Sequence, residues 1–278
     1  MHLPRSWISA ALLLGHLALS AQAPAPSPAG GLGDLLVAPA RVVFEGRKRS
    51  AELNLSNIGP ARATYRVSLV RMEMSEAGAF RELPFDAETE GLKALFRFSP
   101  REVTLEPQES QTLRIQVRKP AQLAEGEYRL HMVFRAVPPA PVAAPVSAEP
   151  AKGISIKLTP VYGVAIPLIV RHGETSARVA ITDAALVEGG RALRFRLDRT
   201  GNQSVYGDLR ATLLPPAGPP QVLAEAAGLA VYTPNPHRLV VLPLRSGPPL
   251  PGGRLRLTYT LPVPDGGGLL AETILPIP

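Results

Sequence analysis

The feature that most constrains this chain is a regular alternation of side chains between residues 153 and 171. Its even positions read Ile154, Ile156, Leu158, Pro160, Tyr162, Val164, Ile166, Leu168 and Val170. A period of two places one set of side chains on one face of a β-strand, and strands in globular proteins usually last about 5–6 residues. Because proline has no N–H to donate, Pro160 and Pro167 favour the edge of a sheet. We therefore expect a long apolar edge strand, which either is covered or pairs with another chain.

The rest of the chain carries short apolar runs separated by turn residues, and this pattern is typical of β-structure. The 278 residues include 24 glycines and 31 prolines, and the runs recur at intervals of about 8–12 residues with almost no helical periodicity. Only residues 86–96 have a pattern compatible with a short helix. A length of this order suggests two domains, and the pattern restarts after residue 171. The sequence predicts an all-β protein with β-sandwich domains, divided near residue 172.

The N-terminus has the three parts of a secretory signal peptide, which we assign to residues 1–23. Arg5 supplies positive charge, residues 7–19 form an apolar core, and Ala21 and Ala23 fit a small-residue cleavage site. The core is shorter than the roughly 20 residues that cross a bilayer as a helix. A flexible leader rich in proline, alanine and glycine is expected over residues 24–34. The mature protein is thus expected to be exported, with no membrane insertion after cleavage.

The sequence offers no support for catalysis, metal binding or nucleic-acid binding. It lacks cysteine, so disulfides and thiolate metal sites are excluded, and it has none of the common nucleophile, zinc-protease or phosphate-loop motifs. His131, His172 and His237 are widely separated and are interpreted as ordinary strand or loop residues. The net charge of +7 comes from scattered basic residues, and the aromatic fraction of 5% leaves few stacking platforms for bases. We expect neither an enzyme nor a cofactor.

β-Augmentation is the mode of recognition that remains. In this mode an extended segment adds to a sheet edge, so that backbone hydrogen bonds give affinity and alternate side chains fill pockets. The alternating face would consist of Ile154, Ile156, Leu158, Tyr162, Val164 and Ile166. The same pattern is equally compatible with a strand that fills the core of its own domain. The prolines, and the stretch of proline and small residues at 138–152 that precedes the strand, favour an interaction edge.

Several segments, in order along the chain, resemble the PapD-like periplasmic chaperones of the chaperone–usher pilus pathway. They are residues 39–46 (PARVVFEG), 53–57 (LNLSN), 98–100 (FSP), 105–107 (LEP), 112–115 (TLRI) and 127–138 (EYRLHMVFRAVP). The strand at 153–171 stands at the place of the family's donor strand. The resemblance covers residues 35–172, whereas the second half of the chain matches more weakly.

The resemblance implies two immunoglobulin-like β-sandwich domains, residues 35–171 and 172–278, set at an angle with a cleft between them. In the family, an arginine and a lysine in the cleft hold the terminal carboxylate of a bound subunit. Arg41 matches that arginine, whereas Pro167 stands at the place of the lysine. The family's interdomain ion network is expected to fall on Glu127, Arg171 and Asp265. The residues of the alternating face would form the donor strand.

These matches imply a non-enzymatic periplasmic chaperone that binds pilus, fimbrial or surface-fibre subunits and delivers them to an outer-membrane usher. Handover would be driven by fuller folding of the subunit with its final partner strand, without a nucleotide. The alternative is an immunoglobulin-like secreted surface or adhesion module, in which the long strand is core and no client exists. A secreted enzyme on a sandwich scaffold is the remaining alternative, and the missing motifs speak against it.

Overall fold

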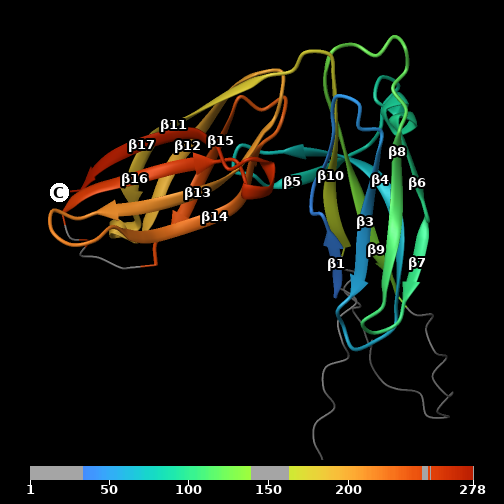
Figure 1. Ribbon diagram of the computed structural model, residues 1–278, viewed down its shortest axis with the longest axis horizontal. Coiled ribbons are helices and arrows are strands. Elements are labelled where there is room, and N and C mark those ends of the chain that lie inside the picture. The colour runs from blue at the N-terminus through green and yellow to red at the C-terminus, as the bar shows by residue number, and fades with distance from the viewer. Residues whose placement is uncertain (1–33, 139–162, 246–249, 251, 278) are drawn as a thin grey trace, which may run out of the picture.

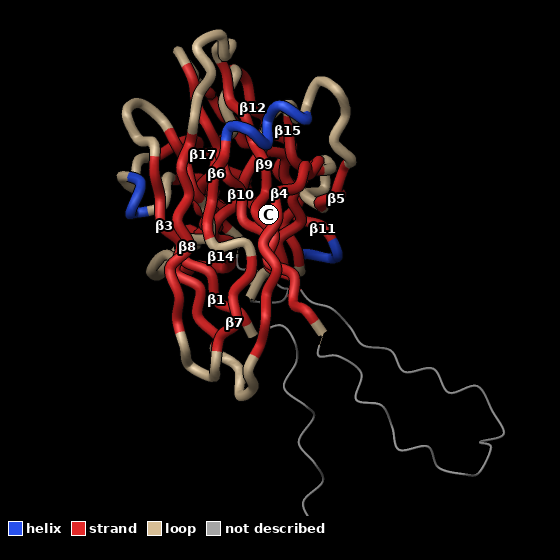
Figure 2. Tube along the Cα trace, turned by 90° about the vertical axis from the view of Figure 1, so that its right-hand side faces the viewer, coloured by secondary structure: helices blue, strands red, loops and turns tan. Residues whose placement is uncertain are grey.

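The structure is a computed structural model, and it describes residues 34–138, 163–245, 250 and 252–277. These residues form two immunoglobulin-like β-sandwich domains that meet at an angle (Figure 1). The predicted all-β class and two-sandwich architecture are therefore confirmed. Figure 2 shows that strands dominate both domains; the helices of the described residues are short 3₁₀ turns, none of them long and apolar enough to cross a membrane. The predicted signal peptide, residues 1–23, lies outside the described part of the chain.

The N-terminal domain packs two sheets around one core. The first sheet is ordered β1–β3–β8–β6 and consists of β1 (Leu35–Ala38), β3 (Ser50–Asn57), β8 (Ser110–Val117) and β6 (Phe96–Ser99). The second is ordered β2–β10–β9–β4–β5, with β7 also on β4, and consists of β2 (Val42–Phe44), β10 (Gly163–His172), β9 (Gly126–Val137), β4 (Ala63–Met74), β5 (Phe80–Leu83) and β7 (Glu102–Leu105). The 3₁₀ turn η1 (Glu90–Leu95) falls where the sequence predicted a short helix.

Alternate side chains of these strands fill the N-terminal core. In β3, Leu53 and Leu55 are fully buried while the residue between them is exposed, and in β4 Tyr65 and Val67 are likewise buried on either side of an exposed residue. Full burial of an aliphatic or aromatic side chain of this size is worth about 1.5–3 kcal/mol. The alternation that predicted these strands is thus the alternation between core and solvent.

The C-terminal domain is a second sandwich with its own core. One sheet, ordered β11–β12–β15, consists of β11 (Ala177–Val187), β12 (Ala192–Gly201) and β15 (His237–Pro243). The other, ordered β14–β13–β16–β17, consists of β14 (Gln221–Val231), β13 (Val205–Leu214), β16 (Gly253–Thr260) and β17 (Leu269–Ile277). The 3₁₀ turns η2 (Glu188–Gly190) and η3 (Val263–Asp265) follow β11 and β16. Tyr259 is fully buried in this core, where its hydroxyl donates to the carbonyl of Leu229 (2.7 Å) and burial raises the pKa of the phenol.

β10, the described end of the long alternating stretch, has different neighbours along its length. From Gly163 to His172 it pairs antiparallel with β9, whereas β2 pairs with it in parallel only from Leu168 to Val170. Within the described part of the chain, residues 163–167 therefore carry no strand on their second flank. This pairing confirms the predicted edge strand for these residues, and Pro167 stands where the open flank ends.

Candidate functional site

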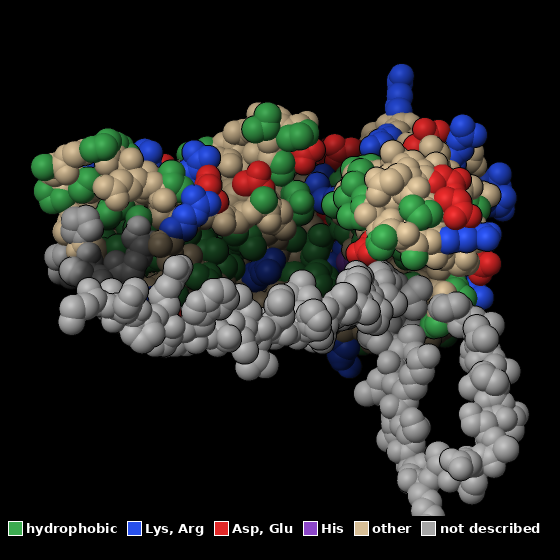
Figure 3. Space-filling model, turned by 90° about the horizontal axis from the view of Figure 1, so that it is seen from below, with side chains coloured by type: hydrophobic (Ala, Val, Ile, Leu, Met, Phe, Trp, Pro, Cys, Tyr) green, Lys and Arg blue, Asp and Glu red, His purple; other side chains and the backbone are tan. Residues whose placement is uncertain are grey.

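The surface where the two domains meet is built largely from one face of β9 and β10. In this pair Glu127, Arg129 and His131 on β9 stand opposite Arg171, Ile169 and Pro167 on β10. Residues opposite each other share a face of the sheet. This face turns toward the C-terminal domain, because Ile169 packs with Ala230 and Tyr232 in one cluster of buried residues. In the view from below, the recess between the domains carries hydrophobic and basic side chains (Figure 3).

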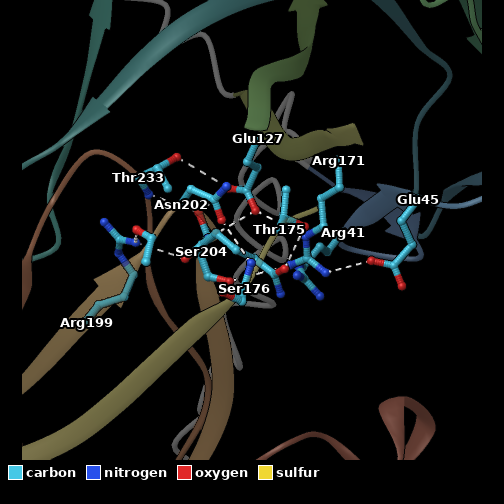
Figure 4. A network of polar contacts seen from close by, with 12 residues as sticks. Arg41, Glu45, Glu127, Arg171, Thr175, Ser176, Arg199, Asn202, Ser204 and Thr233 are labelled. Atoms are coloured by element: carbon cyan, nitrogen blue, oxygen red, sulfur yellow. Dashed lines mark hydrogen bonds and ion pairs between the residues drawn. The ribbon is translucent and has the colours of Figure 1, made fainter. Parts of the chain in front are cut away.

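Glu127 is the centre of a polar network that joins the two domains (Figure 4). Its side chain is fully buried, and its Oε2 lies 3.2 Å from Nε of Arg171. From the C-terminal domain, the backbone N–H of Ser204 donates to Oε2 (3.0 Å), and the Ser204 hydroxyl donates to Oε1. Arg171 also pairs with Glu45, at 2.9 Å. Because a buried charge is tolerated only with such partners, the network requires both domains to be in place.

The composition of this network differs in part from the prediction. Glu127 and Arg171 come together as expected, but Asp265 is not with them. Its carboxylate instead lies 3.8 Å from the guanidinium of Arg41. The residues that the C-terminal domain contributes to Glu127 are Ser204 and Thr233. Sequence reasoning missed both, because a lone serine or threonine beside a turn gives no sign of a partner in another domain.

Arg41 directly precedes β2 and reaches into a pocket of about 420 Å³ between the domains. Its side chain is 15% exposed, and its guanidinium lies over the ring of Tyr206, 4.6 Å from the ring centre. Among the described residues this guanidinium has no hydrogen-bond acceptor, and its Nε is buried without a partner. An arginine with unused donors in a recess is suited to hold a carboxylate through bidentate, charge-assisted hydrogen bonds.

The position expected for a second cation is occupied by a buried proline. Pro167 stands opposite His131 and supplies no charge. Lys48, in the connection between β2 and β3, lines the same pocket as Arg41. Lys119 is engaged elsewhere, since its ammonium donates to the backbone carbonyl of Arg171 (2.6 Å). Lys48 is thus the described lysine that shares a pocket with Arg41.

His131 is buried on the same face of β9, with 3% of the residue exposed. Its imidazole packs against the rings of Phe80 and Tyr232, whose centres are 5.3 and 6.3 Å away. Its Nδ1 has no hydrogen-bond partner among the described residues. Burial lowers the pKa of His131 to about 3, and the Arg129 guanidinium acts in the same direction. The described residues contain no group of side chains suited to hold a metal ion.

We expect His131 to reduce the stability of the fold in mild acid. The unfolded histidine takes up a proton below a pKa of 6.5, whereas the folded one stays neutral down to about 3. The stability that this group contributes is complete above pH 6.5 and declines as the pH falls toward 3. The loss amounts to about 2 kcal/mol at pH 5. Urea unfolding at neutral pH and at pH 5 measures the difference.

A His131→Phe variant is the matched control, because it keeps an aromatic ring but cannot take up a proton. Between neutral pH and pH 5, its free energy of unfolding should fall by roughly 2 kcal/mol less than that of the parent chain. The same pH dependence in both proteins would contradict the burial of a neutral histidine at this position.

The hairpin of β4 and β5 makes a second contact between the domains, which we call the hairpin brace. The turn at residues 75–79 reaches the C-terminal domain (Figure 1), where the N–H of Leu239 donates to the carbonyl of Glu76 (2.7 Å). The side-chain amide of Asn235 donates to the carbonyl of Met74 (2.7 Å), and Nε2 of His237 lies 3.2 Å from the Glu76 carboxylate. No sequence pattern predicted this brace, because two of its hydrogen bonds end on backbone carbonyls.

The predicted binding face of the long strand lies only partly within the described residues. Ile154, Ile156, Leu158 and Tyr162 lie outside them. Val164 is half-buried against the N-terminal core, and Ile166 is 2% exposed inside that core. Ile166, which the prediction placed on the binding face, is therefore a core residue of its own domain in this structure.

Comparison with known proteins gives structural similarities alone. No protein-family model matches the chain, and no curated protein matches it with significance. The CupB2 chaperone of Pseudomonas aeruginosa has a similar structure, with a TM-score of 0.43 and 13% identity over 87% of this chain and 100% of that one. The SafB chaperone of Salmonella enterica, solved with the SafA pilin, has a TM-score of 0.41 and 17% identity over 90% and 99% of the two chains. The E. coli chaperone DraB has a TM-score of 0.41 and 15% identity over 87% and 98%. At these values the similarity assigns neither ligands nor residue roles.

Proposed function

We propose that this chain is a divergent PapD-like chaperone that binds unfinished pilus, fimbrial or surface-fibre subunits in the periplasm and delivers them to an outer-membrane usher. The observation that carries the proposal is the environment of the Arg41 guanidinium. Its guanidinium lies in a pocket between two sandwich domains and has no hydrogen-bond acceptor among the described residues. The role is recognition, and it requires no chemical reaction at the bound subunit.

The first part of the proposed site is an anchor for the C-terminal carboxylate of the subunit. The planar guanidinium of Arg41 matches a carboxylate in a bidentate, charge-assisted pair. The ring of Tyr206 covers one face of the guanidinium and restricts its orientation. Because Pro167 supplies no second cation, the anchor relies on Arg41 together with Lys48, which lines the same pocket.

The second part is the edge strand β10, which would extend its sheet into the client. Among the described residues, positions 163–167 have an open flank at which another strand fits. The proposed donor residues are Ile154, Ile156, Leu158, Tyr162 and Val164, without Ile166, which is buried in the chain's own core. They share the parity of Leu168, which faces the N-terminal core. If the strand continued at a period of two, these side chains would point to the side of that core, and the core of the client would adjoin the core of this domain.

The third part is the buried pair of Glu127 and Arg171 in the N-terminal domain, which Ser204 of the C-terminal domain completes. It holds the domains in one orientation and so fixes Arg41 relative to Tyr206 of the C-terminal domain. Because a buried ion pair loses much of its Coulomb energy to desolvation, we assign it a role in geometry rather than in net stability.

An Ile156→Asp variant is expected to lose capture of a subunit while remaining folded. The test is co-export of the tagged chain with a pilus subunit encoded in the same genome, followed by quantification of the subunit that co-purifies. An unpaired carboxylate in an apolar groove costs several kcal/mol, which corresponds to at least about tenfold less captured subunit. Thr159→Asp, which adds the same charge at an odd position, is the matched control and should leave capture largely intact.

The competing function is a secreted surface or adhesion module, and the burial of Ile166 and Leu168 in the chain's own core favours it. In that case Ile156→Asp should destabilise the fold as strongly as Ile166→Ala, a core truncation that costs about 2–5 kcal/mol. Thermal unfolding separates the two functions. A stable Ile156→Asp variant that still captures the subunit would rule out strand donation.

A further inference from the structure

The Arg41 pocket carries opposite charges on its two walls. Arg41 and Lys48 come from the N-terminal domain, and Asp208 and Asp265 come from the C-terminal domain. One oxygen of Asp208 is already engaged, since it accepts a hydrogen bond from the backbone N–H of Gly228 (2.8 Å). The charges of the four side chains cancel, so the addition of a single carboxylate gives the occupied pocket a net negative charge.

Asp265 is held at the mouth of this pocket by its backbone. It ends η3, and the N–H groups of Asp265 and Gly267 both donate to the carbonyl of Pro262, at 2.8 and 3.2 Å. Gly266 and Gly267 follow with φ values of 109° and 67°, which residues with a side chain rarely adopt. These bonds fix the turn, whereas the Asp265 side chain is half-exposed. A ligand that enters the pocket therefore meets this carboxylate.

Asp265 compensates the charge of Arg41 without occupying its hydrogen-bond donors. The distance of 3.8 Å between Oδ2 of Asp265 and Nη1 of Arg41 is longer than a hydrogen bond. An incoming carboxylate can therefore bind the guanidinium, but two carboxylates then lie beside one cation. Like charges at such short range repel each other, and a positive group next to Asp265 relieves the repulsion.

We propose that Asp265 makes the pocket select chain ends that carry a basic side chain next to their C-terminal carboxylate. This inference rests on the proposed function, since it assigns the ligand carboxylate to Arg41. The lysine or arginine of the ligand pairs with Asp265, and the occupied pocket stays neutral. A chain end with an acidic side chain at that place brings a third carboxylate to the pocket mouth and is rejected.

The test uses the acetylated tetrapeptides AAKA and AAEA, each with a free carboxylate and each as a C-terminal amide. They are titrated into the mature chain at low ionic strength, and binding is followed by NMR. We expect the lysine acid to bind about fivefold more tightly than the glutamate acid, near the upper limit for a half-exposed ion pair. Asp265→Asn should reduce this ratio to less than about twofold, and Asp265→Lys should reverse the preference.

The outcomes distinguish this inference from the proposed function. Equal binding of the two acids to the parent chain, or an unchanged ratio in Asp265→Asn, would overturn the selection and leave the anchor intact. Binding of the amides as tight as that of the acids, or no binding of either acid, would overturn the anchor itself. Thermal unfolding shows that each variant is folded, which is expected because the hydrogen bonds that close the turn are backbone bonds.

Discussion

An Arg41→Ala variant is expected to bind a subunit that ends in a free carboxylate at least about thirtyfold more weakly than the parent chain. The substitution removes the one guanidinium of the proposed anchor and leaves the client carboxylate unpaired in the cleft. The effect on stability should be small, because Arg41 makes no hydrogen bond to another described residue. What the folded protein loses is the contact with the Tyr206 ring, worth about 0.5–1 kcal/mol, and the half-exposed ion pair with Asp265, worth at most about 1 kcal/mol. Titration with a purified subunit, followed by anisotropy of a label, measures the affinity.

Arg41→Lys is the matched control for geometry, since it keeps the charge but loses the planar fork. We expect its affinity to lie between those of the parent and the alanine variant. A subunit whose carboxylate is blocked as an amide should bind all three proteins with similar, weak affinity. A large thermal shift in Arg41→Ala without any loss of binding would count against the anchor and assign Arg41 a structural role.

A Glu127→Ala variant is expected to be the most destabilising single change at the domain junction. The side chain is fully buried, and its removal leaves Arg171, whose side chain is 12% exposed, without its buried counter-ion. Breaking a buried ion pair by removing one partner costs about 3–5 kcal/mol. The Ser204 hydroxyl and N–H lose their acceptor at the same time. Chemical unfolding measures the stability, and small-angle scattering measures the accompanying change in the angle between the domains.

Glu45→Ala is the control for this experiment, because Glu45 pairs with the same Arg171 but its side chain is 62% exposed. An exposed pair of this kind contributes at most about 1 kcal/mol. Equal losses in the two variants would show that burial does not set the strength of the network. Glu127→Gln, which keeps the shape but not the charge, should fall between them in stability.

The sequence predicted what depends on local pattern and missed what depends on how the domains meet. Alternation located β3, β4 and β10, because core and solvent impose a period of two on each strand separately. Glu127 and Arg171 were predicted through the resemblance, and the structure brings them together. The partner of Asp265 was predicted wrongly, since it depends on where one turn of the C-terminal domain lies relative to Arg41. No local signal reports such a placement.

The long strand shows a further limit of pattern reasoning. A period of two says which side chains share a face, but not whether that face belongs to the same molecule. Ile166 has the parity of the proposed donor residues and is buried in its own domain. The pattern likewise could not tell whether the face of Ile169 is exposed to solvent or packs against the C-terminal domain, as it does in the structure. The positions of β2 and of the second domain are needed to decide whether such a face packs within its own domain, against the other domain or against another chain.

One sheet of the N-terminal domain connects the exposed border of β10 with the hairpin brace. The strands follow in the order β10, β9, β4 and β5, so the open flank of β10 and the hairpin brace lie toward opposite edges of one sheet. Glu76 and Met74 attach that hairpin to the far domain through their backbone carbonyls, so the sheet that presents the open flank of β10 is also the sheet that holds the second domain.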